Sequence, residues 1–133
     1  MVTRWFARVL GIVLALLAVI GFFVEGEHLL GFMNVDIALD VVRLVLAALL
    51  IWAGFFSEAR KPVNIVLWIV GASYLLLAIM GMIDPNVFGL LPTGLTGFDL
   101  VFHIIVGIAA IVVTFITDRT DASADRRTAT PRT

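Results

Sequence analysis

Four long apolar runs constrain this chain more than any other feature. They lie at about residues 5–24, 37–56, 63–83 and 98–116, and each is close to the roughly 20 residues that a helix needs to cross a bilayer. Lipid offers the backbone no hydrogen-bond partner, and no run alternates polar with apolar residues, so each run predicts a helix. The chain is 62% hydrophobic and 14% charged, which is too apolar for a soluble domain of 133 residues. We therefore predict an all-α integral membrane four-helix bundle.

The chain divides into one membrane domain and one tail. Residues 1–117 hold the four predicted spans, whereas residues 118–133 are rich in Asp, Arg and Thr without an apolar run, so we expect a disordered cytoplasmic tail. Arg4 and Arg8 before an apolar stretch also fit a secretory signal peptide. No Ala-x-Ala-like cleavage site follows Val24, so the first run is expected to remain a helix of the mature protein.

The positive charges predict the orientation in the membrane. Eight of the nine basic residues precede or open the first span, lie between the second and third, or follow the fourth. The loops at 25–36 and 84–97 contain neither Lys nor Arg. Because cytoplasmic loops carry the excess of Lys and Arg, both termini are expected on the cytoplasmic side of the cell (inner) membrane.

A spacing of 60 residues relates the two halves of the chain. The small residues Gly11, Ala18 and Gly21 recur as Gly71, Ala78 and Gly81. This recurrence predicts two parallel transmembrane-hairpin repeats related by an axis along the membrane normal. Small residues allow close helix approach in lipid, so we expect the first and third spans to meet through them, with Gly107 as a matching position in the fourth span.

A polar stripe runs along the second and fourth spans near their outer ends. Asp36, Asp40 and Arg43 are spaced 4 and 3 residues apart, on one helical face, and Asp99 and His103 form a corresponding face. An arginine inside the membrane costs about 2.5–3.5 kcal/mol unless an acidic group pairs with it. Two interpretations stay open. The stripe is either a buried ion pair that fixes helix register, for example Arg43 with Asp99, or a polar pocket for a proton or small ligand.

Other kinds of site have weaker support. Glu25, Glu27, His28 and Asp84 lie at the same outer rim, where His and carboxylates suit a divalent metal, but their spacing matches no established motif. Catalytic signatures and cysteine are absent from the sequence. A net charge of −1 does not favour nucleic acid. We therefore predict no metal, no cofactor, no nucleic-acid partner and no enzymatic activity.

Several motifs give the chain a family resemblance over about residues 8–113. They are Gly21-Phe22, Leu30-Gly31-Phe32, Gly71-x-x-Tyr74 through Gly81, and Asp99-x-x-x-His103-x-x-x-Gly107. With these motifs the chain resembles domain of unknown function 4383, a family of small four-helix bacterial membrane proteins frequent in actinobacteria. The resemblance implies the fold and an inner-membrane location, and the family has no assigned activity. The family's His-Asn-x-x-His pattern becomes Leu39-Asp40-x-x-Arg43 here, which suggests that a salt bridge replaces the paired histidines.

These observations lead to one expected function and one alternative. We expect a non-catalytic accessory, interaction or structural protein of the membrane that contacts lipid and a membrane-protein partner or further copies of itself. The alternative is a small transport or sensing protein whose polar pocket lies between the second and fourth spans. The outer loops carry several apolar residues, which predicts that they lie in the membrane interface or tuck over the mouth of the bundle.

Overall fold

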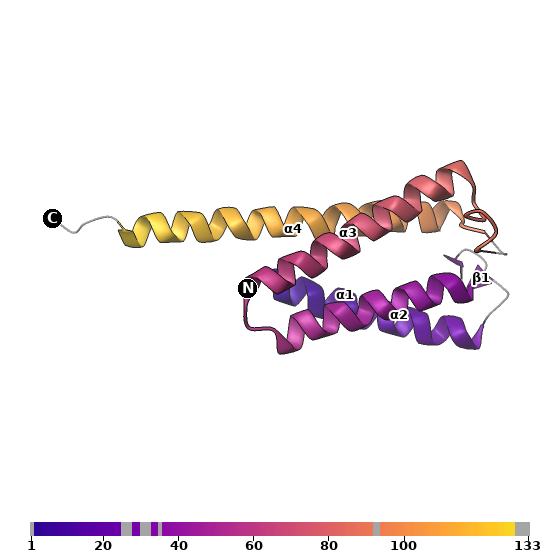
Figure 1. Cartoon of the computed structure of the whole chain (residues 1–133), viewed down its shortest axis with the longest axis horizontal. Coiled ribbons are helices and arrows are strands. Elements are labelled where there is room, and N and C mark those ends of the chain that lie inside the picture. The colour runs from indigo at the N-terminus through magenta and orange to yellow at the C-terminus, as the bar shows by residue number, and fades with distance from the viewer. Residues whose placement is uncertain (1, 25–27, 30–32, 35, 92–93, 130–133) are drawn as a thin grey trace.

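The computed structural model of the chain describes residues 2–24, 28–29, 33–34, 36–91 and 94–129. Over these residues it has four helices that are long and apolar enough to cross a membrane, so the prediction of four spans is confirmed (Figure 1). They are α1 (Val2–Phe23), α2 (Ile37–Ile51) with its π-helical continuation η1 (Trp52–Phe56), α3 (Arg60–Ile83) and α4 (Gly97–Ala129). Short strands β1 (His28–Leu29) and β2 (Met33–Asn34) pair antiparallel in the first loop.

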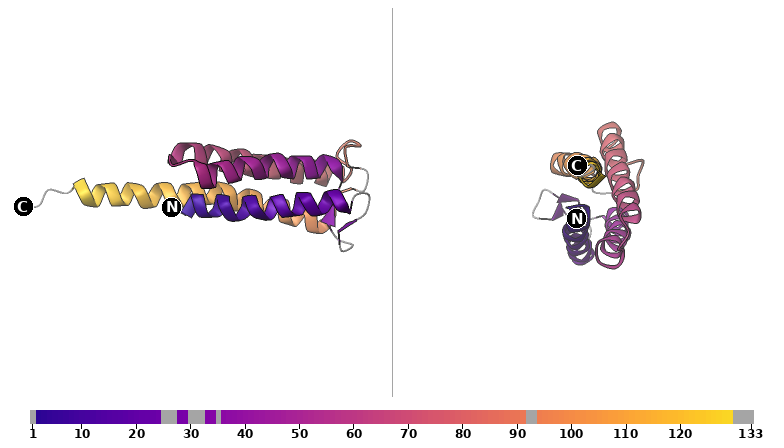
Figure 2. Two further views of the ribbon diagram at one scale, coloured as in Figure 1. Left: turned by 90° about the horizontal axis from the view of Figure 1, so that it is seen from below. Right: turned by 90° about the vertical axis from the view of Figure 1, so that its left-hand side faces the viewer.

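The helices form two antiparallel hairpins that lie side by side. Most helix contacts join α1 to α2 and α3 to α4, and fewer contacts connect the two hairpins (Figure 2). The described termini lie on the same side of the bundle, which we call the terminal end, and the α1–α2 and α3–α4 loops lie at the opposite, loop end (Figure 1). Short connections place sequence neighbours beside each other, as in other antiparallel bundles.

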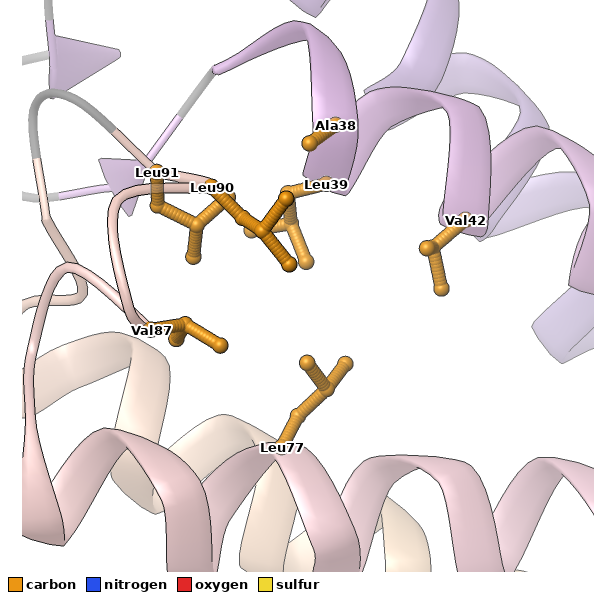
Figure 3. A pocket seen from close by; sticks show the side chains of 7 residues that line it. All are labelled: Ala38, Leu39, Val42, Leu77, Val87, Leu90 and Leu91. Carbon is orange, nitrogen blue, oxygen red and sulfur yellow. The ribbon is translucent and has the colours of Figure 1, made fainter.

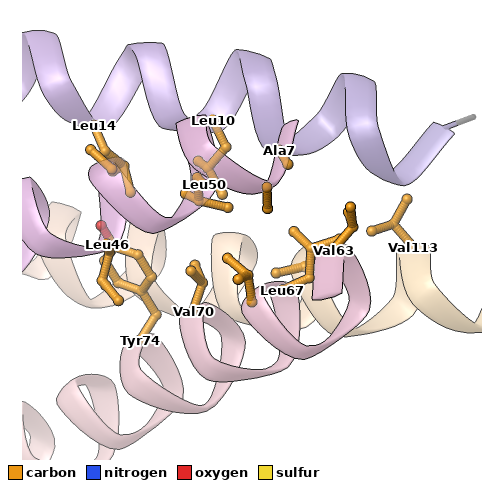
Figure 4. Packing of buried hydrophobic residues seen from close by; sticks show 14 residues of the cluster. Ala7, Leu10, Leu14, Leu46, Leu50, Val63, Leu67, Val70, Tyr74 and Val113 are labelled. Atoms are coloured by element: carbon orange, nitrogen blue, oxygen red, sulfur yellow. The ribbon is translucent and has the colours of Figure 1, made fainter. Parts of the chain in front are cut away.

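Buried apolar side chains from all four helices fill the interior. The main cluster includes Leu14 of α1, Leu50 of α2, Leu67 of α3 and Ala110 of α4, each without exposed surface (Figure 4). Many large apolar side chains on the outer faces stay exposed, for example Leu16 at 58% and Ile105 at 61%. A bundle that is apolar on its outside as well as inside is suited to lipid rather than to water.

The small residues of the 60-residue spacing pack within each hairpin. A Cβ added at Gly11 would lie 3.0 Å from the Cβ of Leu50, and one added at Gly71 would lie 2.9 Å from the carbonyl oxygen of Gly107. The expectation that α1 and α3 meet through these residues is therefore wrong: their glycines face α2 and α4 instead. Close approach stabilises the partner that is adjacent in sequence, because a short loop already holds it alongside.

Arg8 links the first two helices at the terminal end. Its Nε donates a hydrogen bond of 2.6 Å to the carbonyl oxygen of Gly54, and its guanidinium lies 5.5 Å from the Trp5 ring centre and 5.0 Å from that of Phe55. The carbonyls at the end of a helix lack helical partners, so a cation there satisfies one of them and interacts favourably with the helix dipole. Gly54 permits the approach, since a Cβ would lie 2.8 Å from Arg8 Cγ.

The loop between α3 and α4, which we call the second loop, folds over the loop end. The Asp84 carboxylate accepts hydrogen bonds of 3.0 Å from the backbone N–H groups of Asn86 and Phe88. Val87, Phe88 and Gly89 follow one another with φ of 49°, 57° and 90°, a left-handed run that turns the chain sharply.

This turn brings apolar loop residues onto the second helix. Val87, Leu91 and Leu95 are buried in one cluster with Leu39 of α2. The prediction that an outer loop tucks over the bundle is therefore confirmed for this loop, while much of the first loop lies outside the described residues.

The helix α4 is longer than predicted. It continues to Ala129, so the expected disorder from residue 118 is wrong as far as Ala129, and residues 130–133 lie outside the described chain. Its first 20 residues form the membrane span and the remaining 13 project beyond the other helices (Figure 1). Extending an existing helix needs no new nucleus, and residues 117–129 contain neither Gly nor Pro.

Candidate functional site

Six buried polar side chains gather in the half of the bundle nearest the loop end. Five were singled out from the sequence, namely Asp36, Asp40 and Arg43 of the second span and Asp99 and His103 of the fourth. The sixth is Tyr74 of α3. Asp36 is 4% exposed and the other five have no exposed surface. We call these six residues the polar cluster.

An ion pair forms the α2 part of the polar cluster. Arg43 Nη1 lies 2.8 Å from Asp40 Oδ1, one helical turn away, and both side chains are fully buried. Among the candidate partners of Arg43, Asp40 is therefore in direct contact. A buried pair does not necessarily stabilise a fold, but removing one member leaves an uncompensated charge in a medium of low dielectric constant.

The first helix closes this ion pair from the side. A Cβ placed on Gly21 would overlap the Asp40 carboxylate, so only glycine fits at this position. Gly21 was selected from the sequence as a helix-packing residue, and its neighbour is a charged side chain rather than another small residue. The face of α1 that carries Gly21 thereby separates the ion pair from lipid.

Asp99 caps the start of α4. Its Oδ2 accepts hydrogen bonds of 2.9 Å from both the backbone N–H and the hydroxyl of Thr96, and its own N–H donates to Thr96 Oγ1 at 3.2 Å. This reciprocal pattern is a capping box, and a carboxylate there is also favoured by the helix dipole. Asp36 is the N-cap residue of α2, with an extended backbone at φ −66° and ψ 145°, and so corresponds to Thr96 rather than to Asp99.

His103 and Tyr74 form the aromatic part of the polar cluster. Their ring centres are 4.9 Å apart. Figure 4 shows the Tyr74 ring reaching from α3 toward Leu46 of α2. Within the described residues, neither ring nitrogen of His103 nor the Tyr74 hydroxyl has a hydrogen-bond partner. Such orphaned buried groups are uncommon in proteins and call for a further partner.

Tyr74 was not predicted as a member of the site. It is the single tyrosine of the chain and stands 60 residues after Leu14, where the first repeat has an apolar residue. Leu14 and Tyr74 are both fully buried. A lone polar ring on the buried face of an otherwise apolar span is the signal that would have revealed it.

The Arg43–Asp99 bridge suggested by the sequence remains a prediction. The hydrogen bonds described above are local, since Arg43 contacts Asp40 and Asp99 contacts Thr96.

The outer rim that the sequence offered for a divalent metal is described only in part. In the part of the chain that is described, no group of three or more His, Asp or Glu side chains is placed to hold a metal ion. Glu25 and Glu27 of the predicted rim lie outside that part, and Asp84 serves the second loop instead.

A cavity of about 60 Å³ lies between α2, α3 and the second loop (Figure 3). The side chains that line it are all apolar: Ala38, Leu39, Val42, Leu77, Val87, Leu90 and Leu91. None of them belongs to the polar cluster, so this cavity does not offer the polar groups that a hydrophilic ligand requires.

Comparisons with protein-family models, with curated proteins and with solved structures give no match to this chain.

Proposed function

We propose that this chain is a non-catalytic integral membrane protein that acts by binding a membrane-protein partner. The four-helix bundle is its anchor, and the projecting part of α4 is its contact segment. The observation that carries this proposal is the 13-residue extension of α4 beyond its membrane span and beyond the other helices (Figure 1). Isolated helices of that length are marginal in water, so a bound partner would stabilise the extension.

The charge of the extension favours a protein over the lipid surface. Residues 117–129 carry three Asp and three Arg, so their net formal charge is zero. Attraction to anionic lipid needs an excess of Lys and Arg near the membrane. Mixed charges instead allow specific pairing with a protein surface.

The anchor role is supported by the distribution of polarity in the spans. Asp40, Arg43 and Asp99 are enclosed by the bundle, while the large side chains that face outward from the spans are apolar. A surface of this kind contacts lipid or the apolar helix of another membrane protein. The apolar outer surface of the bundle is therefore suited to a membrane anchor.

The cytoplasmic location of the contact segment is part of the same proposal. The described ends of α1 and α4 lie on one side of the bundle, and eight of the nine Lys and Arg residues belong to segments on that side or to the remaining tail. The positive-inside rule assigns such a side to the cytoplasm of a bacterial-type cell.

We also propose that the bundle arose by duplication of a hairpin and that it is a divergent member of the four-helix family named above. Support comes from burial, because every buried position of α1 is buried again 60 residues later in α3. The α1 positions are Thr3, Ala7, Leu10, Gly11, Leu14, Ala18 and Gly21, and the α3 positions are Val63, Leu67, Val70, Gly71, Tyr74, Ala78 and Gly81. The same spacing relates buried Arg43 to buried His103.

Affinity purification from the native membrane tests the interaction role. The full chain and a chain ended after Ile116 would each carry a tag at the N-terminus and be crosslinked before extraction. We expect a stoichiometric partner with the full chain and its loss from the shortened chain, which should still insert because it keeps all four spans. Recovery of identical proteins with both chains would overturn the role of α4, and recovery of the full chain alone would overturn the partner-binding role.

A second candidate function, sensing or transport at the polar cluster, is favoured by the orphaned polar atoms of His103 and Tyr74. The double variant Arg43→Met with Asp99→Leu separates the two functions. A structural cluster predicts that this variant folds and still binds the partner. A functional pocket predicts a stable protein that has lost its transport or sensing activity.

A further inference from the structure

The polar cluster carries more negative than positive charge. Among the buried side chains of the described chain, three carboxylates (Asp36, Asp40 and Asp99) stand against one guanidinium, Arg43. Asp40 is matched by Arg43. Asp36 and Asp99 lie at the starts of α2 and α4, where helix dipoles offset part of their charge. An additional positive charge would therefore be favoured inside the bundle at this depth.

His103 is placed to carry that charge. It lies one helical turn after Asp99, on the same face of α4. A neutral imidazole always presents one N–H donor and one acceptor nitrogen, and here both ring nitrogens lack a partner among the residues described. The Tyr74 hydroxyl, with its ring centre 4.9 Å from that of His103, lacks one as well.

We propose that His103, Asp99 and Tyr74 form a proton-binding site that is filled from the loop end of the bundle. A hydronium ion at that end gives its proton to the free imidazole nitrogen. The imidazolium is then balanced by the Asp99 carboxylate, and a water molecule joins it to the Tyr74 hydroxyl. This inference rests on the second candidate function above and names its ligand.

The charged neighbours of His103 come from two helices. Asp99 precedes it by one turn on α4, and Arg43 is the buried cation of α2. Asp40 pairs with Arg43, and Gly21 of α1 lies against the Asp40 carboxylate.

The carboxylates of Asp36 and Asp99 also provide a route for the proton. Asp36 directly precedes α2 and Asp99 lies in the first turn of α4, so both are nearer to the loop end than His103 is. Chains of carboxylates and histidines within membrane spans are typical of proton relays. With His103 six residues after the start of α4, the proton travels about 9 Å along the helix axis.

Nitrogen NMR of the histidine ring tests the site directly, because the chain has only two histidines. The full chain with His28→Gln, labelled in histidine and placed in zwitterionic nanodiscs, reports on His103 alone. We expect the ring to change from neutral to charged as the pH falls from about 8 to about 4, with the amide spectrum showing a folded protein throughout.

Three variants and one change of ions sharpen this test. Asp99→Asn, which keeps an acceptor for Thr96, should lower the proton affinity of His103 about tenfold or more. Tyr74→Phe should shift the ring signals, and Asp118→Asn in the projecting part of α4 should change neither. Replacing sodium by choline should have no effect.

A ring that stays neutral over the whole range, or a transition that Asp99→Asn leaves unchanged, overturns the proposal. A dependence on sodium would assign the site to a metal cation instead and also overturns it. Neither result touches the partner-binding role of α4, which the purification experiment tests separately.

Discussion

Gly21 of α1 lies directly against the carboxylate of Asp40 in α2, so that a methyl group at residue 21 would overlap that carboxylate. The contact joins a residue without a side chain to the acidic member of a buried ion pair. Because Gly21 has no side chain, α1 can lie directly over the charged group of α2. The stability of the first hairpin therefore depends on the absence of a side chain at this position.

Gly21→Ala should destabilise the protein by about 1–3 kcal/mol, because the added methyl group forces apart α1 and the ion pair. The free energy of unfolding can be measured in mixed detergent micelles from the fluorescence of the three tryptophans. Gly97→Ala is the matched control, since a Cβ there meets no atom within 4 Å. Equal stability of the two variants would contradict the close contact.

Arg43→Met should cost about 3–5 kcal/mol, because Asp40 is then left buried without its cation. Adding Asp40→Leu should restore most of the lost stability, since the second change removes the uncompensated charge. Arg127→Met, in the exposed part of α4, serves as the control for loss of an arginine. If the double variant were no more stable than the single one, the two side chains would not act as a pair.

Thr96→Ala should lower stability by about 1 kcal/mol, because the hydroxyl of the capping box is lost. Thr96→Ser keeps the hydroxyl and should remain close to the original protein. Hydrogen exchange of the first amides of α4 gives a local measurement, in which only the alanine variant should exchange faster. Similar exchange in both variants would show that the cap does not hold the helix start.

Arg8→Lys should destabilise the terminal end by about 1 kcal/mol, although the charge is kept. Lysine lacks the planar guanidinium that donates to the Gly54 carbonyl and stacks near Trp5 and Phe55. The emission of Trp5, isolated by replacing the other tryptophans with phenylalanine, reports on this end. Lys61→Arg, an exposed exchange between the same two residue types, should leave both stability and emission unchanged.

Phe88→Asn should raise stability by about 1 kcal/mol, because asparagine tolerates the left-handed backbone that Phe88 adopts at φ 57°. The side chain is 69% exposed, so little packing is lost. Leu90→Asn provides the comparison, since Leu90 is similarly exposed at 63% but has no positive φ. A stability gain at both positions, or at neither, would contradict an origin in the backbone.

The sequence predicts best those features of the structure that the lipid environment determines. The start of α2 at Ile37 and its end with η1 at Phe56 agree with the predicted span of 37–56, because lipid leaves a polypeptide little choice but a helix. The spacing of Asp40 and Arg43 also placed them on one face, and the structure pairs them. Helical periodicity and the cost of an unpaired charge suffice for both results.

Features that depend on three-dimensional packing were not predictable in the same way. The side of α1 that carries Gly11 was recognised, but a pattern of small residues does not say which neighbour covers them, and α2 rather than α3 does so. The sequence does not single out Tyr74, because aromatic residues in a membrane span usually serve packing. The left-handed turn at Val87 has no local sequence signal, since valine is among the residues least suited to it.

The helix α4 is continuous from its membrane span to its projecting end, so it can act as a rigid lever. From Gly97 to Ala129 no loop interrupts the helix, so a rotation at His103 turns Arg126 and Arg127 through the same angle. The projecting 13 residues measure about 20 Å at 1.5 Å per residue, so a tilt of about 10° displaces the tip by roughly 3–4 Å. A tilt of α4 at the loop end would therefore displace the tip of the helix beyond the terminal end.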